Sequence, residues 1–310
     1  MDSYLVGLAV CLGFLFGWNN GAFLFGNLIG SGTATVRTAF AISVAGLVLG
    51  VVFEGQKLYS GLVGSLAPSA TDAVMLTTFL VVAVFTLSLT LLRLPVSMSM
   101  VMVAAFLGSS FSSANPINAG RSAEVVLFWF AAPLATAALT FITYTWLTDF
   151  LARFGILAVD SLNRAGSGFG ALLVSYALGA NNVGLIIGSA GGAAGPLGYE
   201  VVAAVTIAAV VGTAVSTRSS VSGTIGDRML SLSPQGVITA FAASAALVWV
   251  GTQFAIPVSI TQCLLGGMLG AAYTKSIAVL NGRLTAETVS VWVVAPVLAF
   301  VAGYLLVLVW

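Results

Sequence analysis

Long apolar stretches fill most of the chain, and short groups of glycine, serine, proline and isolated charges separate them. The charge-free runs 3–36, 125–148 and 288–310 exceed the roughly 20 residues that a helix needs to cross the hydrocarbon core of a membrane. The pattern predicts about five membrane segments in each half of the chain. They are 3–31, 35–53, 70–92, 95–111 and 122–150, followed by 169–194, 198–216, 232–254, 257–272 and 286–309. The expected fold class is therefore an all-α polytopic membrane protein.

Two short motifs occur twice at one fixed distance. Gly-Trp-Asn-Asn at 17–20 returns as Gly-Ala-Asn-Asn at 179–182, and Pro-Val-Ser-Met-Ser at 95–99 returns as Pro-Val-Ser-Ile-Thr at 257–261. Both pairs have the same offset, since 179 − 17 = 162 and 257 − 95 = 162. A duplicated unit accounts for this arrangement. Its shared positions interrupt helices or form hydrogen bonds within apolar surroundings, and broken helices in membrane proteins usually surround a binding site.

The duplication divides the chain into a first transmembrane repeat at 1–152, an inter-repeat linker at 153–166 and a second transmembrane repeat at 167–310. Because each repeat has an odd number of membrane segments, the second repeat is turned upside down relative to the first. We therefore expect two inverted-topology repeats. The first helix of each repeat is expected to be broken, at 17–21 and at 179–182.

The segments 95–111 and 257–272 are short and open with Pro-Val-Ser. A half helix or re-entrant segment fits their length as well as a full crossing does, and the pattern leaves both open. Proline favours the first helical position, so the backbone amides at 96–99 and 258–261 are expected to be free. A helix N-terminus concentrates such donors together with about half a positive charge, which suits an anion.

The predicted anion site combines these amides with polar side chains from both repeats. The hydroxyls belong to the Pro-Val-Ser motifs, and the side-chain amides belong to the Asn pairs. The predicted substrate-binding residues are Asn19, Asn20, Ser97, Ser99, Asn181, Asn182, Ser259 and Thr261. Small and polar residues also occur where membrane helices pack closely, so helix packing is the alternative for any single one of them.

Charged residues make up only 6% of the chain, and the net charge is +1. This excludes a nucleic-acid surface, which needs clustered cations. Histidine is absent and the carboxylates do not cluster, so we expect no metal site, no cofactor, no catalytic residues and no enzyme. Glu54 lies at the end of the second apolar segment. A pair with Lys57 at the membrane interface is the favoured interpretation, and a role in coupling is the alternative.

The four motifs together resemble those of the PiT family of inorganic phosphate transporters, and the resemblance covers nearly the whole chain. Members of that family carry Gly-Ala-Asn-Asp and Pro-Val-Ser-Thr-Thr-His motifs. The resemblance implies a secondary transporter that binds its anion near mid-membrane between half-helix starts and holds cations at the Asn-Asp motifs. This chain departs from the pattern, because Asn20 and Asn182 replace the aspartates and Met100 and Gln262 replace the histidines.

The missing aspartates bear on the choice of anion. A carboxylate accepts the proton of phosphate, whereas it repels sulfate, which has no proton to donate. Their loss therefore favours sulfate ahead of phosphate and weakens a sodium site. We expect a secondary active transporter coupled to co-transported H⁺ by alternating access. The alternatives are a Na⁺-coupled phosphate transporter and a passive anion channel. The expected partners are the oxyanion and the lipid bilayer, with a homodimer left open.

Overall fold

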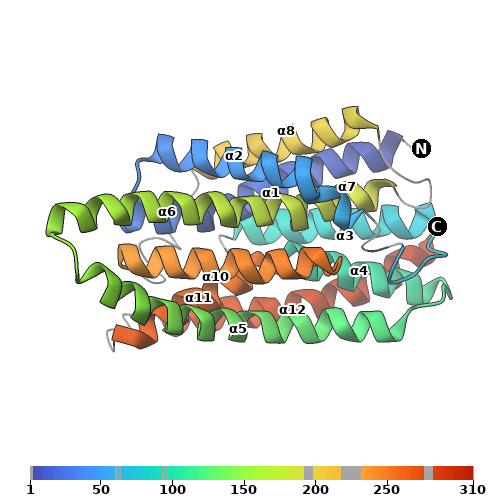
Figure 1. Ribbon diagram of the computed structural model, residues 1–310. Helices are drawn as coiled ribbons and strands as arrows, with labels where there is room; N and C mark the ends of the chain where they lie inside the picture. The colour runs from blue at the N-terminus through green and yellow to red at the C-terminus, as the bar shows by residue number, and fades with distance from the viewer. Residues whose placement is uncertain are drawn as a thin grey trace.

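The computed structural model describes residues 3–59, 62, 64–92, 94, 96–191, 198–217, 232–275 and 282–309. All the regular structure in these ranges is helical (Figure 1). In the first repeat the elements are α1 (Ser3–Gly30), α2 (Val36–Glu54), the 3₁₀ turn η1 (Gly55–Leu58), α3 (Asp72–Leu91), α4 (Met98–Ser112) and α5 (Ala119–Leu151). In the second they are α6 (Ile156–Leu178), the π-helical turn η2 (Gly179–Val183), α7 (Gly184–Gly191), α8 (Tyr199–Ser216), α10 (Pro234–Gln253), α11 (Ile260–Lys275), α12 (Gly282–Leu306) and the 3₁₀ turn η5 (Val307–Val309).

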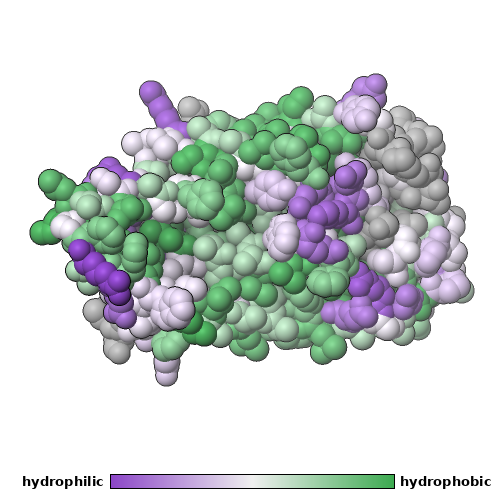
Figure 2. All heavy atoms as spheres, in the orientation of Figure 1, coloured by the Kyte–Doolittle hydropathy of each residue, from purple (hydrophilic) through white to green (hydrophobic). Residues whose placement is uncertain are grey.

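Eight of the described helical stretches are long and apolar enough to cross a membrane. In Figure 2 the visible face is mostly green along the middle of the helices, and the purple groups gather toward the two ends. Apolar side chains along the middle and polar side chains at the ends are what a bilayer requires of a spanning bundle. The chain is a multi-pass integral membrane protein with an all-helical fold, as the sequence predicts.

Several closely packed helix pairs join one repeat to the other. α1 packs along α8, and α2 packs along α6. Glycines allow these backbones to touch: a methyl group added at Gly17 would lie 2.0 Å from the carbonyl oxygen of Ala209, and one added at Gly179 would lie 2.1 Å from that of Leu47. The two contacts are equivalent, since 209 − 47 = 162. Close approach at small residues is the usual packing solution for membrane helices.

The short helices pack in the same crossed way. α4 lies against α12, and α11 lies against α5. A methyl group added at Gly108 would lie 2.1 Å from the carbonyl oxygen of Phe300, and one added at Gly270 would lie 2.2 Å from that of Ala137. Both glycines are therefore packing positions. A helix of 15 residues such as α4 is only about 22 Å long, less than the roughly 30 Å of the hydrocarbon core.

The expected break in the first helix is absent in one repeat and present in the other. α1 continues through 17–21 as a regular helix, so that part of the prediction is wrong. Gly17 serves the contact with α8, and Asn20 donates back to the carbonyl oxygen of Phe16 on its own helix (3.2 Å), so neither residue interrupts the helical hydrogen bonds. In the second repeat the break is the π-helical turn η2, a feature often found at functional sites.

The predicted linker at 153–166 is mostly helical. The chain leaves the helical conformation only at 152–155, and α6 begins at Ile156. Asp160 and Arg164, the charged residues that suggest a linker, lie one helical turn apart. The Nε atom of Arg164 is 3.0 Å from Oδ2 of Asp160. Opposite charges at this spacing support a solvent-exposed helix. The connection between the repeats is therefore a four-residue turn followed by a long helix.

Candidate functional site

One hydrogen-bond arrangement occurs in both repeats and holds the segment before each short helix. In the first repeat, Nδ2 of Asn19 donates to Oγ1 of Thr90 (2.8 Å), and its Oδ1 accepts from the backbone N–H of Val96 (3.3 Å). The Thr90 hydroxyl donates in turn to the carbonyl oxygen of Thr86, which leaves it able to accept from the amide. Sequence reasoning missed Thr90, although Thr252 stands at the same 162-residue offset.

The second repeat reproduces these bonds. Nδ2 of Asn181 donates to Oγ1 of Thr252 (3.0 Å), and its Oδ1 accepts from the N–H of Val258 (2.8 Å). The Thr252 hydroxyl donates to the carbonyl oxygen of Val248. The N–H groups of Val96 and Val258, which the sequence predicts to be free, are therefore occupied by asparagine oxygens.

The helix starts also differ from the prediction. α4 begins at Met98 and α11 at Ile260, so neither helix starts at its proline. Pro95 lies outside the described residues, and Pro257 precedes the helix by three residues, with its carbonyl oxygen accepting from the indole of Trp129 (2.9 Å). Because the asparagine side chain holds the N–H group next to the proline, the backbone stays extended until the following serine.

The second repeat has further bonds that the described part of the first repeat lacks. Nδ2 of Asn181 also lies 3.0 Å from the carbonyl oxygen of Ile256, and Nδ2 of Asn182 donates to that of Val258 (2.9 Å). Oγ of Ser259 accepts from the N–H of Gln262 (3.3 Å), which caps α11. In the first repeat, the Ser97 side chain makes no such cap bond.

The structure brings the two short-helix starts together. Oγ of Ser99 donates to the carbonyl oxygen of Val258 (3.1 Å), which joins the start of α4 to the segment before α11. Ser97 and Ser99 have their hydroxyl oxygens 3.4 Å apart, and Ser259 and Thr261 have theirs 3.2 Å apart. All eight predicted site residues are buried, with at most 4% of their surface exposed.

A small cavity lies where the two repeats meet. It is a narrow gap between packed side chains and has no room for the centre of a water molecule. Its lining residues are Phe16, Met98, Ser99, Met102, Asn182, Leu185 and Ile186. None of them is charged, and the two polar ones are predicted site residues. The site is therefore closed, neutral and largely apolar in this conformation.

Glu54 lies outside this site. Its carboxylate is 3.0 Å from Nζ of Lys57, so the expected ion pair is confirmed. It also accepts from the indole of Trp249 (3.4 Å) and the amide of Gln253 (3.2 Å), which connects the end of α2 to the end of α10. A purple group lies over this part of the molecule in Figure 2, where Figure 1 shows both helices ending.

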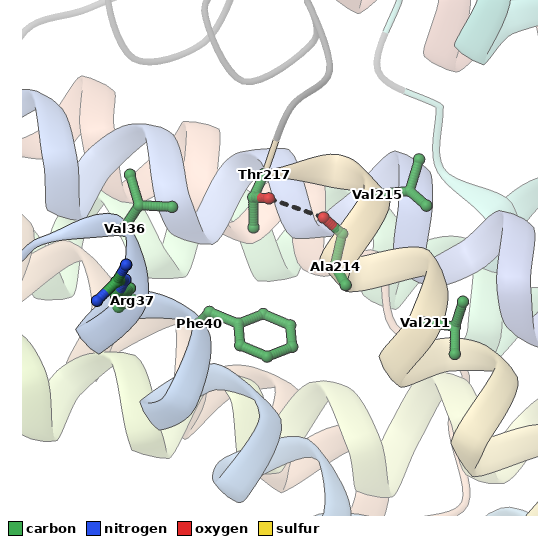
Figure 3. A pocket seen from close by; sticks show the side chains of 7 residues that line it. All are labelled: Val36, Arg37, Phe40, Val211, Ala214, Val215 and Thr217. Atoms are coloured by element: carbon green, nitrogen blue, oxygen red, sulfur yellow. Dashed lines mark hydrogen bonds between the residues drawn. The ribbon is translucent and has the colours of Figure 1, made fainter.

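A larger pocket of about 650 Å³ opens on the surface between the start of α2 and the end of α8. Figure 3 shows the ring of Phe40 between the two helices, with Arg37 beside it on α2. The Thr217 hydroxyl donates to the carbonyl oxygen of Ala214 (2.7 Å). Apart from Arg37 and Thr217 its lining is apolar, and it shares no lining residue with the cavity between the repeats, so it is separate from the predicted site.

Comparison with known proteins places this geometry in a family. The model of the phosphate transporter family matches residues 16–303. The chain belongs to this family. Two proteins that carry the name "Putative phosphate permease" are similar to it: one from Methanocaldococcus jannaschii is 26% identical over 94% of this chain and 92% of its own length. The other, from Haemophilus influenzae, is 33% identical over 28% of this chain and 21% of its own length.

A solved structure named "The sodium-dependent phosphate transporter" has the same fold, with a TM-score of 0.86. The match covers 99% of this chain and 98% of the other at 14% identity. The resemblance that the sequence motifs indicate is therefore confirmed at the level of the family. Since the family is a class of transporters, the expectation that the protein is not an enzyme is confirmed as well.

Proposed function

We propose that the protein is a secondary active transporter for a small tetrahedral oxyanion, with phosphate as the first candidate substrate. The observation that carries the proposal is the bond from Ser99 to the carbonyl oxygen of Val258, which joins the starts of two short helices at a buried site. Helix starts bind anions through backbone amides and dipoles and need no cation. The family of the chain supports the choice of phosphate.

The two repeats are related by inverted topology in this proposal. The common offset of 162 residues, the duplicated asparagine bonds and the crossed helix pairs support it. In Figure 1, α4 lies toward the right-hand end of the molecule and α11 toward the left-hand end. Transporters with this symmetry bind their substrate at the interface of the repeats, near the middle of the membrane. Of the eight predicted site residues, Ser97, Ser99, Asn182, Ser259 and Thr261 are then the proposed substrate contacts. Asn19 and Asn181 hold the segments before the short helices, and Asn20 bonds to its own helix.

Alternating access explains why the site is closed. The gap beside Ser99 and Asn182 has no room for a water molecule, so in this proposal substrate enters only after the repeats move apart. In this motion the Ser99 hydroxyl leaves the carbonyl oxygen of Val258 and becomes free for the anion. A passive channel needs a continuous pore, and the closed cavity favours a carrier.

Coupling to a cation follows from the charge of the substrate. Moving an anion into a negative interior costs about 2.3 kcal/mol per charge per 100 mV. Co-transported H⁺ or Na⁺ offsets this cost. The name of the structural neighbour supports Na⁺, whereas the asparagines in place of aspartates support H⁺. Glu54 remains the candidate for a coupling role, since its carboxylate connects the two repeats and is mostly buried, with 16% of its side-chain surface exposed.

The test is uptake of labelled phosphate and labelled sulfate into proteoliposomes that hold purified protein. Each anion is measured with a sodium gradient, a pH gradient or neither, and Glu54→Gln is measured beside the wild type. We expect phosphate to accumulate only when a cation gradient is present. Uptake of neither anion under any gradient would overturn the proposal, and single-channel currents would identify a channel instead. Uptake of sulfate in preference to phosphate would leave the transport mechanism intact and change its substrate.

A further inference from the structure

The side chain of Asn182 carries an oxygen atom for which the described part of the protein provides no donor. Its Nδ2 atom donates to the carbonyl oxygen of Val258, whereas its Oδ1 atom is buried and has no hydrogen-bond partner among the described residues. Asn182 is only 4% exposed and lines the closed cavity together with Ser99. A buried acceptor without a donor is destabilising. Several buried side-chain atoms in the described residues lack a partner, but of these only the Asn182 oxygen belongs to a residue that lines the cavity, so it points to a ligand there.

The orientation of this amide follows from its neighbour. The two ends of an asparagine side chain differ only in whether they donate or accept. The Val258 carbonyl can only accept, so the end that faces it must be the NH₂ group. The oxygen then faces away from that carbonyl. Flipping the Asn182 amide would turn its oxygen toward the Val258 carbonyl, which is also an acceptor, so the flip does not satisfy the oxygen.

The cavity supplies one donor and one acceptor to a ligand. Five of its seven lining residues have no hydrogen-bonding side chain, and the polar ones are Ser99 and Asn182. The Ser99 hydroxyl can turn from the Val258 carbonyl to an anion oxygen. The Asn182 oxygen needs a hydrogen that the ligand brings. Phosphate near neutral pH has both an acceptor oxygen and a P–OH donor, whereas sulfate has acceptors alone.

We propose that Oδ1 of Asn182 accepts a hydrogen bond from the P–OH group of bound phosphate and thereby selects protonated phosphate over sulfate. The inference rests on the proposed transport function and adds the residue that determines its substrate. It reverses the preference expected from the missing aspartates, because the amide oxygen still accepts a hydrogen bond but carries no charge. A sulfate oxygen in the same place would face a buried lone pair with no hydrogen between them.

A cation at Asn182 is the competing explanation. Hard cations take several oxygen ligands at once. Side chains around the cavity provide only the oxygen of Asn182 and the hydroxyl of Ser99, and the remainder are aliphatic, aromatic or thioether groups. The equivalent residue in the first repeat, Asn20, donates to Phe16 on its own helix and does not line the cavity. Asn20 therefore serves as a matched control for Asn182.

The experiment measures inhibition of labelled phosphate uptake by unlabelled phosphate, sulfate and fluorophosphate in proteoliposomes. Fluorophosphate keeps the tetrahedral shape and the double negative charge but has no acidic hydrogen near neutral pH. The proteins are the wild type, Asn182→Ala, Asn182→Asp and Asn20→Ala. In the wild type, phosphate is expected to compete at least about 100-fold better than sulfate or fluorophosphate, because the site hydrogen-bonds a substrate hydroxyl.

Asn182→Ala is expected to weaken phosphate binding by about 10- to 100-fold and to leave sulfate binding nearly unchanged, so the selectivity ratio falls. Asn182→Asp keeps an acceptor and is expected to keep the preference for phosphate, which also shows that a variant at this position folds. Asn20→Ala is expected to leave the ratio unchanged, whatever it does to the rate.

Three results would overturn the inference. The first is an equal loss of phosphate and sulfate binding in Asn182→Ala. The second is an altered sodium dependence in that variant with its anion ratio intact, which would make the oxygen a cation ligand. The third is a wild type that binds sulfate or fluorophosphate as well as phosphate. Transport of no oxyanion by the wild type would instead contradict the proposed function itself.

Discussion

In the second repeat, Asn181 binds Thr252, Ile256 and Val258 at 2.8 to 3.0 Å. Within the described residues, the equivalent Asn19 binds only Thr90 and, at 3.3 Å, Val96. The second repeat also caps its short helix through the Ser259 hydroxyl and ties Asn182 to the neighbouring segment, whereas the described part of the first repeat has neither bond. The start of α11 is therefore held by more hydrogen bonds than the start of α4, although the two belong to equivalent parts of the repeats.

If the protein works by alternating access as proposed, the difference predicts which half moves. Hydrogen bonds that are fewer and longer cost less to break, so the start of α4 can shift while the start of α11 stays in place. The bond from Ser99 to the carbonyl oxygen of Val258 is then the contact that opens first. The loosely held half provides the mobile donor, and the firmly held half provides the fixed acceptor.

The largest loss of stability is expected at the contact glycines, where the two repeats pack in the same way. Gly17→Ala and Gly179→Ala each place a methyl group about 2 Å from a carbonyl oxygen of the partner helix. Overpacking of this kind costs about 3 kcal/mol or more in unfolding free energy. Thermal unfolding in detergent should show similar losses in both variants. A clear difference would mean that the crossed helix pairs α1–α8 and α2–α6 are not equivalent.

Replacement of Asn181 and of Asn19 is expected to lower stability by different amounts. Asn181→Ala leaves the N–H of Val258 and the carbonyl oxygen of Ile256 without this partner, which costs about 3 kcal/mol. Asn19→Ala removes fewer bonds and is expected to cost about 1–2 kcal/mol. The same unfolding measurement compares the two variants. Equal losses would contradict the view that the second repeat is held more firmly.

The smallest change in stability is expected for substitutions at the starts of α11 and α4. Ser259→Ala removes a cap bond from α11 and is expected to lower stability by about 1 kcal/mol. Ser97→Ala removes no cap bond and is expected to leave stability nearly unchanged. Both variants should weaken anion uptake, because both hydroxyls lie at the proposed site. A stable Ser259→Ala protein with normal phosphate affinity would remove that residue from the cap and from the site.

The sequence predicts much of this architecture, because motifs that recur at one fixed distance rarely match by chance. A single offset of 162 residues relates the asparagine pairs, the Pro-Val-Ser motifs and the contact glycines. Apolar length locates some spans to within a few residues, as α2 at Val36–Glu54 illustrates beside the predicted 35–53, but it misses the polar first turns of α6, which begins at Ile156 and not at 169. The polar residues are expected at one site because polar groups deep in a membrane need partners.

Other features depend on competition among hydrogen-bond partners, which a pattern of residue types does not record. The helix starts lie three residues beyond the proline because Asn181 takes the N–H of Val258. Asn20 and Asn182 stand at equivalent positions, yet one bonds to its own helix and the other reaches the segment before α11. Tertiary contacts, not local sequence, decide between these two outcomes.

The crossed helix pairs have a consequence for how the two halves of the chain can exist. α1 covers α8, α2 covers α6, α4 covers α12, and α5 covers α11, so each repeat depends on the other to bury its close-packed surfaces. Either half expressed alone would leave these glycine-lined surfaces uncovered. The two halves are therefore expected to fold as one unit and not as separable domains.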